Sequence, residues 1–515
     1  MTPDVLVGID IGSSNVKTVL FDGMFQVLTS RTQEYETLIP QPGWSEYRPD
    51  QWWECVCSTL RGAIDEANIE PERIAGVGLS SLGCCPIPMD KKGNVVCNGI
   101  PWSDQRAQAE VDFLVENCRE SIFEKCKNYP TTLNATTHLM WIKNNLPEIY
   151  WQVHKYTEPT GFLGQRFTGE YTMDYAFASA LDFGFDTRSL EWDDELIEAM
   201  GLDREIFPRL HPNAEPLGCV TAKAAGETGV PEGVPVYCGS VDMLAATLAA
   251  GAIHPGQGFY SMGSGSNMMV ITDNQQVAAP ELLSLFHPIG PHLRLLDGVQ
   301  GSIGYSMRWF RDQFGGSFFD TQSEEKPFER LSNAVAQTAP GAGGLIYLPH
   351  LFGKFHPTLN PSAKGVFFGF DATTSSSQFV RAVMEGCTFA ANQSLMNIRK
   401  LGLSVDEIIV TGGPSNSPQW CQIMADIFGC TIVTVRVPDA SPFGSAILTG
   451  VGTGVIPNFD AAIPKGKRVG NIYQPNRDNA AIYEDLFELY QNTYTSLLDP
   501  FEELAAIDRK HELKK

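Results

Sequence analysis

Val5-Leu6-Val7-Gly8-Ile9-Asp10-Ile11-Gly12-Ser13-Ser14-Asn15-Val16-Lys17-Thr18-Val19-Leu20-Phe21-Asp22 is the stretch from which the fold is inferred. Two apolar runs flank a turn of glycine and serine, a pattern that predicts a β-hairpin. Small residues leave backbone N–H groups free beside Asp10, so this turn can hold phosphate oxygens while the carboxylate holds a magnesium ion, directly or through water. An ordinary hairpin with a polar turn is the alternative. The chain offers no P-loop pattern, so a nucleotide would have to bind by another device.

A second stretch of the same kind opens the other half of the chain. Residues 256–271 are again an apolar run, a glycine-serine turn and another apolar run. Two such hairpins indicate an internal duplication whose turns face each other across a cleft. We place the domain boundary near 250–258, with an N-terminal domain over residues 1–250, a C-terminal domain over 251–466 and a helical tail over 467–515.

Between the hairpins lies Gly239-Ser240-Val241-Asp242-Met243-Leu244. The residues before it, 233–238, predict a buried strand, and the residues after it predict a helix that stops at Gly251. Asp242 therefore falls at a strand-to-helix junction, where the positive end of the helix favours a carboxylate. Local sequence leaves two interpretations open: Asp242 caps the helix, or it is a general base aimed into a cleft.

Other segments predict an alternation of strands and helices. Helices are expected over residues 50–68, 105–117, 305–314, 378–400 and 419–428, and strands over 74–79, 345–348, 407–411 and 431–435. Gly412 and Gly413 follow one of these strands, where a glycine pair lets a flat ligand approach the backbone closely. Trp102 and Arg106 precede the helix at 105–117. Such residues usually pack and pair, but in a sugar-binding cleft they offer an apolar face and charged hydrogen bonds to hydroxyls.

Composition limits the class of protein. A chain of 515 residues exceeds what one hydrophobic core usually serves, so two large domains are expected. The net charge of −23 argues against a nucleic-acid or anionic-membrane surface. Neither a signal peptide nor an apolar run of membrane-spanning length is visible. The twelve cysteines include no CxxC pair, which favours reduced thiols and a cytoplasmic location.

Several motifs occur in an order that resembles a known family. They are Gly8-Ile9-Asp10-Ile11-Gly12-Ser13-Ser14, Gln41-Pro42-Gly43-Trp44-Ser45-Glu46, Trp102-Ser103-Asp104-Gln105-Arg106, Gly239 to Asp242, Gly263-Ser264-Gly265-Ser266, Gly365 to Gly369 with Arg381 to Gly386, and Gly412-Gly413-Pro414-Ser415-Asn416-Ser417 with Trp420 and Asp426. Each is weak alone, and together they span nearly everything from Val5 to about Gly454. The chain resembles the FGGY carbohydrate kinases, which implies an α/β fold of two ribonuclease-H-like (actin-like ATPase) domains with a cleft between them.

The resemblance also implies the roles of individual residues. Asp242 would accept the proton of a sugar hydroxyl that attacks the γ-phosphate of ATP, and Asp10 would hold Mg2+. Contacts to ATP would come from Gly12, Ser13, Ser14, Lys17, Gly263, Ser264, Gly265, Gly412, Gly413 and Asn416. The implied partners are ATP and a small sugar or polyol, with a homodimer as a further option. In this family the domains close over the substrates, which excludes water.

The departures from the family pattern concern the sugar. Xylulose kinases have Gln-Met-His where this chain has Leu82-Gly83-Cys84, and the Arg-Glu pair of glycerol kinases is missing. His138 stands in place of a usual Lys. We therefore expect neither D-xylulose nor glycerol to be the best substrate. The sugar contacts expected instead are Trp102, Asp104, Arg106 and Met243, the last in place of a polar residue.

A second class of function remains open from the sequence. Actin- and Hsp70-like proteins use the same hairpins to bind a nucleotide without a sugar, and a catalytically inactive kinase homologue could have a regulatory role. The acidic residue before the second hairpin, Asp242, and the Trp-x-Asp-x-Arg group at Trp102 favour the kinase.

Overall fold

The computed structural model describes residues 3–263, 265–318, 326–437, 439–463 and 469–511. It divides into two compact units, each built from several stretches of the chain. Unit 1 comprises residues 1–253, 273–295 and 437–465, and unit 2 comprises residues 254–272, 296–436 and 466–515. Unit 1 thus differs from the N-terminal domain expected from the sequence, because it also contains two segments from the second half of the chain.

Unit 1 is built on a six-stranded sheet in the order β11-β12-β4-β1-β2-β3. Its strands are β1 (Val5–Ile11), β2 (Asn15–Phe21), β3 (Val27–Glu34), β4 (Ile74–Ser81), β11 (Pro216–Cys219) and β12 (Pro235–Val241). β1 and β2 form the predicted antiparallel hairpin, with Leu6 opposite Phe21 and Ile11 opposite Val16. β4 is parallel to both β1 and β12, so the carboxyl ends of these three strands lie at one edge of the sheet.

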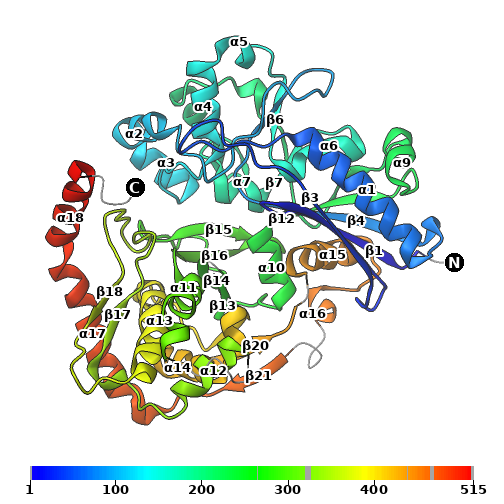
Figure 1. The fold of residues 1–515 in the computed structure, drawn as a ribbon. Coiled ribbons are helices and arrows are strands. Elements are labelled where there is room, and N and C mark those ends of the chain that lie inside the picture. The colour runs from blue at the N-terminus through cyan, green and yellow to red at the C-terminus, as the bar shows by residue number, and fades with distance from the viewer. Residues whose placement is uncertain (1–2, 264, 319–325, 438, 464–468, 512–515) are drawn as a thin grey trace. The chain divides into compact units, whose positions relative to one another are not determined.

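The two faces of this sheet are covered by different helices. Alternate residues of β1, from Val5 to Ile11, pack in the core with α1 (Pro49–Ala67) and α6 (Pro159–Thr168). The opposite face carries Leu6 and is covered by α10 (Asp242–Ala250) and α15 (Ala440–Gly452). α15 comes from near the end of the chain, and Figure 1 shows it, in orange, beside the blue strands of this sheet.

The rest of unit 1 consists of short elements outside the six-stranded sheet. They are β5 (Ile87–Met89), α2 (Gln108–Asn117), α3 (Arg119–Cys126), α4 (Ala135–Asn145), α5 (Pro147–Tyr150), β6 (Lys155–Thr157), β7 (Thr172–Asp174), α7 (Tyr175–Leu181), β8 (Phe185–Asp186), β9 (Glu191–Trp192), α8 (Asp194–Ala199), β10 (Arg209–His211), α9 (Ala222–Thr228), β15 (Leu283–His287) and α16 (Phe459–Ala462). The turn-rich region before β12 buries Phe177, Phe185 and Phe207, so it has apolar packing of its own.

Unit 2 repeats the strand pairing of unit 1. Its strands belong to a seven-stranded sheet in the order β15-β16-β14-β13-β19-β20-β21, in which β15 and the start of β16 come from residues assigned to unit 1. They are β13 (Gln257–Met262), β14 (Ser266–Thr272), β16 (Gly290–Gln300), β19 (Glu407–Gly412), β20 (Thr431–Val435) and β21 (Val469–Tyr473). β13 pairs antiparallel with β14 and parallel with β19, which is parallel to β20. The same relations link β1 with β2, β4 and β12, so the structure contains the internal duplication that the two hairpins predict.

The remaining elements of unit 2 are mostly helices. They are α11 (Ile303–Phe318), α12 (Pro327–Val335), β17 (Ile346–Leu348), β18 (Val366–Phe368), α13 (Ser376–Lys400), α14 (Pro418–Phe428), α17 (Ala480–Ser496) and α18 (Leu498–His511). The helical tail is attached to this unit: Tyr483 Oη of α17 donates to Glu385 Oε1 of α13 over 2.8 Å and accepts from Arg381 Nη2 over 2.8 Å.

Two sequence expectations concern the chain as a whole. All twelve cysteines are free thiols, as the absence of CxxC pairs predicts. Of the helices in the described ranges, none combines the length and the apolar composition that crossing a bilayer requires.

Candidate active site

The carboxyl edge of the unit 1 sheet gathers three segments that are far apart in sequence. Asp242 follows β12, residues 82–85 follow β4, and Asp10 is the next-to-last residue of β1. Asp10 lies opposite Ser80 on β4 and Lys17 on β2. Ser80 Oγ donates to Asp10 Oδ1 over 2.8 Å. Burial raises the pKa of Asp10 to about 6, while the Ser80 hydrogen bond and the Lys17 charge oppose that rise.

Asp242 is the first residue of α10 rather than its cap. The N-cap position belongs to Val241, whose φ of −61° and ψ of 142° are extended, so Asp242 does not occupy the N-cap position. Asp242 Oδ1 accepts the N–H of Met243 over 2.7 Å. Burial raises the pKa of Asp242 to about 7, and the charge of Asp10 adds to the rise. A carboxyl group with a pKa near 7 is suited to accept a proton at neutral pH.

β12 is irregular immediately before Asp242. Its register with β4 shifts between Cys238 and Val241, and Ser240 has a φ of 75°, in the left-handed region that non-glycine residues rarely adopt. Ser240 is fully buried, and its hydroxyl has no hydrogen-bond partner within the described chain. A bulge redirects the side chains that follow it. The sequence did not reveal this strained residue beside Asp242.

The turn of the first hairpin presents backbone N–H groups. Its carbonyl oxygens are engaged: Tyr35 Oη donates to Gly12 O, Tyr47 Oη donates to Ser13 O over 3.0 Å, and Tyr35 N–H donates to Ser14 O over 3.1 Å. Ser13 and Ser14 are exposed, and no acceptor in the described ranges is paired with their N–H groups. This arrangement fits the predicted phosphate-binding turn.

Lys17 is engaged by a carboxylate. Its Nζ lies 2.5 Å from Oδ1 of Asp439, which precedes α15. The charge of Asp439 in turn contributes to the raised pKa of Asp10. A phosphate oxygen that approached Lys17, as the sequence predicts, would have to compete with Asp439.

Asp104 and Arg106 form a buried network. Arg106 donates from its backbone N–H and Nε to Asp104 Oδ1 over 2.8 and 2.9 Å, and from Nη2 to Oδ2 over 2.8 Å. Its Nη1 donates to Glu46 Oε1 over 2.9 Å, and its guanidinium lies 3.8 Å from the ring centre of Trp44. Ser45 N–H donates to Asp104 Oδ2 over 2.6 Å. Because these groups are already engaged, the structure favours packing and pairing over direct sugar contacts.

The other two predicted sugar contacts are placed differently. Trp102 is 48% exposed, so its ring is available to a ligand. Met243 is partly buried next to Asp242, and its backbone N–H is engaged by the Asp242 carboxylate.

A buried polar pair lies behind the loop that follows β4. Cys84 Sγ lies 3.8 Å from Nδ1 of His138, and both residues are fully buried. Burial lowers the pKa of His138 to about 4, so its imidazole is neutral near pH 7. A Cβ on the neighbouring Gly83 would lie 3.0 Å from Val241 Cγ1, which places this loop next to Asp242. The shared departure of Cys84 and His138 from the family pattern is the sequence signal that could have linked them.

In unit 2, the predicted nucleotide contacts meet at the carboxyl ends of β13 and β19. Met262 lies opposite Gly412 on these parallel strands, so Gly263 and Gly412 are neighbours. Gly304 N–H of α11 donates to Gly263 O over 3.0 Å, and a Cβ on Gly265 would lie 3.6 Å from Gln300 O. Ser264, also predicted to contact ATP, lies outside the described residues.

The two glycines after β19 have different reasons to be glycine. Gly412 has a φ of 98°, and a Cβ there would overlap the carbonyl oxygen of Met262, so strand packing requires it. Nothing lies within 4 Å of a Cβ built on Gly413, which leaves room for a ligand. Asn416 ends the short helical turn Gly413–Asn416 and donates from Nδ2 to Gly413 O over 3.1 Å.

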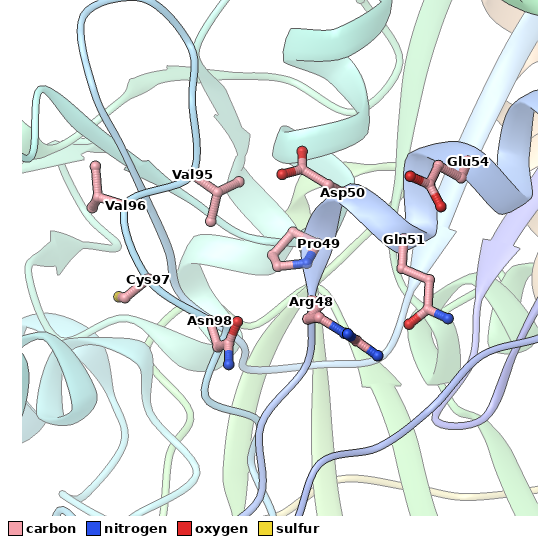
Figure 2. A pocket seen from close by; sticks show the side chains of 9 residues that line it. All are labelled: Arg48, Pro49, Asp50, Gln51, Glu54, Val95, Val96, Cys97 and Asn98. Carbon is pink, nitrogen blue, oxygen red and sulfur yellow. The ribbon is translucent and has the colours of Figure 1, made fainter.

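An open hollow on unit 1 contains none of these residues (Figure 2). Figure 2 shows residues 48–51 and Glu54, at the start of α1, on one side and residues 95–98 on the other. The empty volume is about 930 Å3. Asp50 in its wall pairs with Arg166, with Oδ1 2.6 Å from Nη2, and Glu54 adds a second carboxylate. These carboxylates do not suit a phosphate-bearing ligand.

Known proteins share this architecture and its motifs. Residues 5–249 match the N-terminal domain of the FGGY family of carbohydrate kinases, and residues 258–453 match its C-terminal domain. The chain belongs to the FGGY family of carbohydrate kinases. Similar proteins include the xylulose kinase of Bacillus subtilis (strain 168), 26% identical over 494 residues with 96% of this chain and 97% of the relative covered. The gluconokinase of the same strain is 25% identical over 508 residues, covering 96% and 98%.

The FGGY kinase fold is also found in solved structures. The crystal structure of xylulose kinase from Rhodospirillum rubrum aligns with a TM-score of 0.89 at 25% identity, covering 97% of this chain and all of that one. The present FGGY kinase is therefore a two-domain α/β protein of the actin-like ATPase fold, and it is an ATP-using sugar phosphotransferase. Relatives of nearly equal identity act on different sugars, so identity does not select the acceptor.

Proposed function

We propose that this kinase transfers the γ-phosphoryl group of ATP to a hydroxyl of a small neutral sugar or polyol, with Asp242 as the general base. The observation that carries the proposal is the position of Asp242. It lies at the edge of the sheet that also carries Asp10, directly after a bulge, and its pKa is raised to about 7.

Phosphoryl transfer asks the protein mainly for positioning and charge stabilisation. Asp242 Oδ1 is engaged by Met243 N–H, so Oδ2 would take the proton of the attacking hydroxyl. The N–H groups of Ser13 and Ser14, with the turn at Gly263 and Gly265, would hold phosphate oxygens. Adenosine would lie in the open space beside Gly413, near Asn416.

Asp10 fits the requirements of a magnesium site. Mg2+ keeps several waters and binds through one or two carboxylates plus substrate phosphates. In the described ranges, no group of three or more His, Cys, Asp or Glu side chains is arranged for a metal, so Asp10 would hold the ion together with the phosphates of ATP. Burial and the nearby Asp439 disfavour ionisation of Asp10, which a cation would relieve. When bound, Mg2+ would neutralise phosphate charge.

The charges of unit 1 favour a neutral acceptor over a sugar acid. A carboxylate substrate needs an available cation. Lys17 is paired with Asp439, Arg106 is enclosed by Asp104 and Glu46, and burial keeps His138 neutral. These residues therefore support a ketose or an alditol. Membership of a carbohydrate-kinase family also weighs against an actin- or Hsp70-like role.

The test is ATP consumption by the purified protein with a panel of pentuloses, hexuloses, tetritols, pentitols, glycerol and gluconate. ATP hydrolysis without an acceptor is the control. We expect one neutral ketose or alditol other than D-xylulose and glycerol to give a kcat/KM at least tenfold above gluconate. A kcat/KM for gluconate equal to the best of the panel would contradict the neutral acceptor. No turnover with any member would favour an inactive homologue.

A further inference from the structure

A buried cation in unit 2 has no counter-charge. Lys354 is only 6% exposed, and its Nζ lies 3.7 Å from the ring centre of Tyr494. No carboxylate in the described ranges forms an ion pair with it. The backbone is fixed here, because Lys354 and Asn360 exchange two hydrogen bonds of 2.9 and 2.8 Å. A buried charge without a partner is costly, so such a site is suited to an anion.

Two histidines with unpartnered nitrogens lie on the same loop. His350 is 5% exposed, and the Nε2 atoms of His350 and His356 are buried without a hydrogen-bond partner in the described ranges. Burial and the charge of Lys354 lower the pKa of both imidazoles. The loop therefore supplies one ammonium group and two imidazole Nε2 atoms. Each Nε2 can donate a hydrogen bond when a bound anion favours the protonated imidazole or the Nε2–H tautomer.

These groups line a small hollow that also receives the start of α11. Its wall includes Gln300, Gly301 and Ser302, the loop with its three basic side chains, and Ala390 of α13. The space inside it is about 250 Å3, a figure that includes space open to solvent. α11 has 16 residues, and the first turn of such a helix carries a partial positive charge. The hollow is too small for a nucleotide, but it suits a single oxyanion.

One acceptor distinguishes between oxyanions. Gln300 Nε2 donates to Gly298 O over 2.6 Å and to Ser394 Oγ over 2.8 Å, which assigns the amide orientation. Its Oε1 is left without a partner within the described chain. Hydrogen phosphate and singly protonated phosphate esters carry a P–OH that can donate to this oxygen, whereas sulfate has no such proton near pH 7.

We infer that this hollow binds a single phosphate group, as inorganic phosphate or on a small phosphate monoester, through Lys354, His350, His356 and the start of α11. None of Gly263, Gly265, Gly412, Gly413 and Asn416 lines it, but its Gln300 lies beside Gly265, so the hollow adjoins the turn proposed to contact ATP without sharing its residues. α11 also contacts the turn after β13 through Gly304 N–H and Gly263 O, so both anion sites share one helix.

The test measures binding to the full chain without turnover, so it is independent of the proposed kinase reaction. Inorganic phosphate, glycerol phosphate and sulfate are titrated by calorimetry into the wild type, Lys354→Met and Lys364→Met. Lys364 is the matched control, because it lies ten residues further on and donates to Pro361 O over 3.3 Å. We expect saturable phosphate binding to the wild type and Lys364→Met, and at least tenfold weaker binding to Lys354→Met. Whichever of inorganic phosphate and glycerol phosphate binds with the higher affinity shows whether the site takes free phosphate or a phosphate monoester.

Melting curves separate this role from a structural one. In phosphate-free buffer, Lys354→Met should melt no lower than the wild type, because the substitution removes an uncompensated charge. Added phosphate should raise the Tm of the wild type but not that of Lys354→Met. If Lys354→Met does not fold, His350→Gln replaces it in the comparison. In NMR spectra of the wild type, phosphate should shift the Nε2 resonances of His350 and His356. Absence of phosphate binding, equal affinity in Lys354→Met, or equal affinity for sulfate would overturn the proposal.

Discussion

The raised pKa of Asp242 points to function rather than stability. A carboxyl group whose pKa is higher in the folded than in the unfolded protein ionises less readily when folded. Its contribution to stability is present below about pH 4 and is lost as the pH rises through about 7. Ionised Asp242 therefore destabilises the folded protein at pH 8. The same sign holds for Asp10, whose pKa is raised to about 6.

Ser240 supplies a test of the strain beside Asp242. Glycine adopts a φ of 75° without a Cβ penalty, and it removes a buried hydroxyl that has no partner in the described ranges. Ser240→Gly should therefore increase the free energy of unfolding by about 1 kcal/mol. Denaturant unfolding measures this change, and a lower free energy of unfolding would show that the serine stabilises the bulge.

Arg106 distinguishes a structural network from a sugar contact. Arg106→Met leaves the buried Asp104 carboxylate without its main partner, so it should lower the free energy of unfolding by about 3–5 kcal/mol. Arg31→Met is the control, because the Arg31–Glu66 pair is about half exposed and should cost about 1 kcal/mol or less. Unchanged stability with a strongly raised KM for the sugar would restore the sugar-contact interpretation.

At the level of elements, α15 packs closely against both β1 and α10, which carry Asp10 and Asp242. A Cβ on Gly444 would overlap the carbonyl oxygen of Ala245 in α10, and one on Gly8 of β1 would overlap Pro442 O. Ser441 Oγ also donates to the backbone oxygen of Asp242 over 3.2 Å. Displacing α15 would therefore move the start of α10, which carries the proposed base.

Gly444→Ala should destabilise the protein by about 3 kcal/mol, because backbone has to move to admit the methyl group. Gly226→Ala is the matched control within a helix: nothing lies within 4 Å of its Cβ, so it should stabilise by up to about 1 kcal/mol. Thermal melting of both variants measures the contrast. Equal Tm values for the two would contradict the close contact between α15 and α10.

Local patterns predicted the elements better than their partners. The hairpins at Asp10 and Gly263, the helix α13 and the strand before Asp242 follow from periodicity and turn residues, and the structure confirms them. Contacts between distant segments have no local signature. Lys17 and Asp439 are 422 positions apart, so no local pattern predicts their ion pair. The hydrogen bond from Arg106 to Glu46 is likewise not predicted by a local pattern. The positive φ of Ser240 was missed because serine does not mark such a site.

At the scale of the whole molecule, the chain passes between the two units five times. Sequence order alone favoured one boundary near residue 250, because it could not show that α15 belongs with β1. Residues 273–295 and 437–465 complete unit 1.

A fragment of residues 1–250 should therefore fail to fold cooperatively. It lacks α15, so Leu6, Val19 and Phe21 lose the apolar cover of Phe443 and Ile447. Joining residues 1–253, 273–295 and 437–465 with flexible linkers should restore a cooperative melting transition in circular dichroism. A cooperative transition for residues 1–250 alone would show that the cover is dispensable.

The most direct test of the account is Asp242→Asn, assayed for kcat and Tm at pH 8 with the best acceptor of the panel. Asparagine keeps the size of the side chain but cannot accept the proton, so kcat should fall about 10²–10⁴-fold. The variant should melt at or above the wild-type temperature, because the ionised carboxylate destabilises the folded state at this pH. ATP binding should be retained. A kcat preserved in the folded variant would contradict the role of Asp242 as the general base.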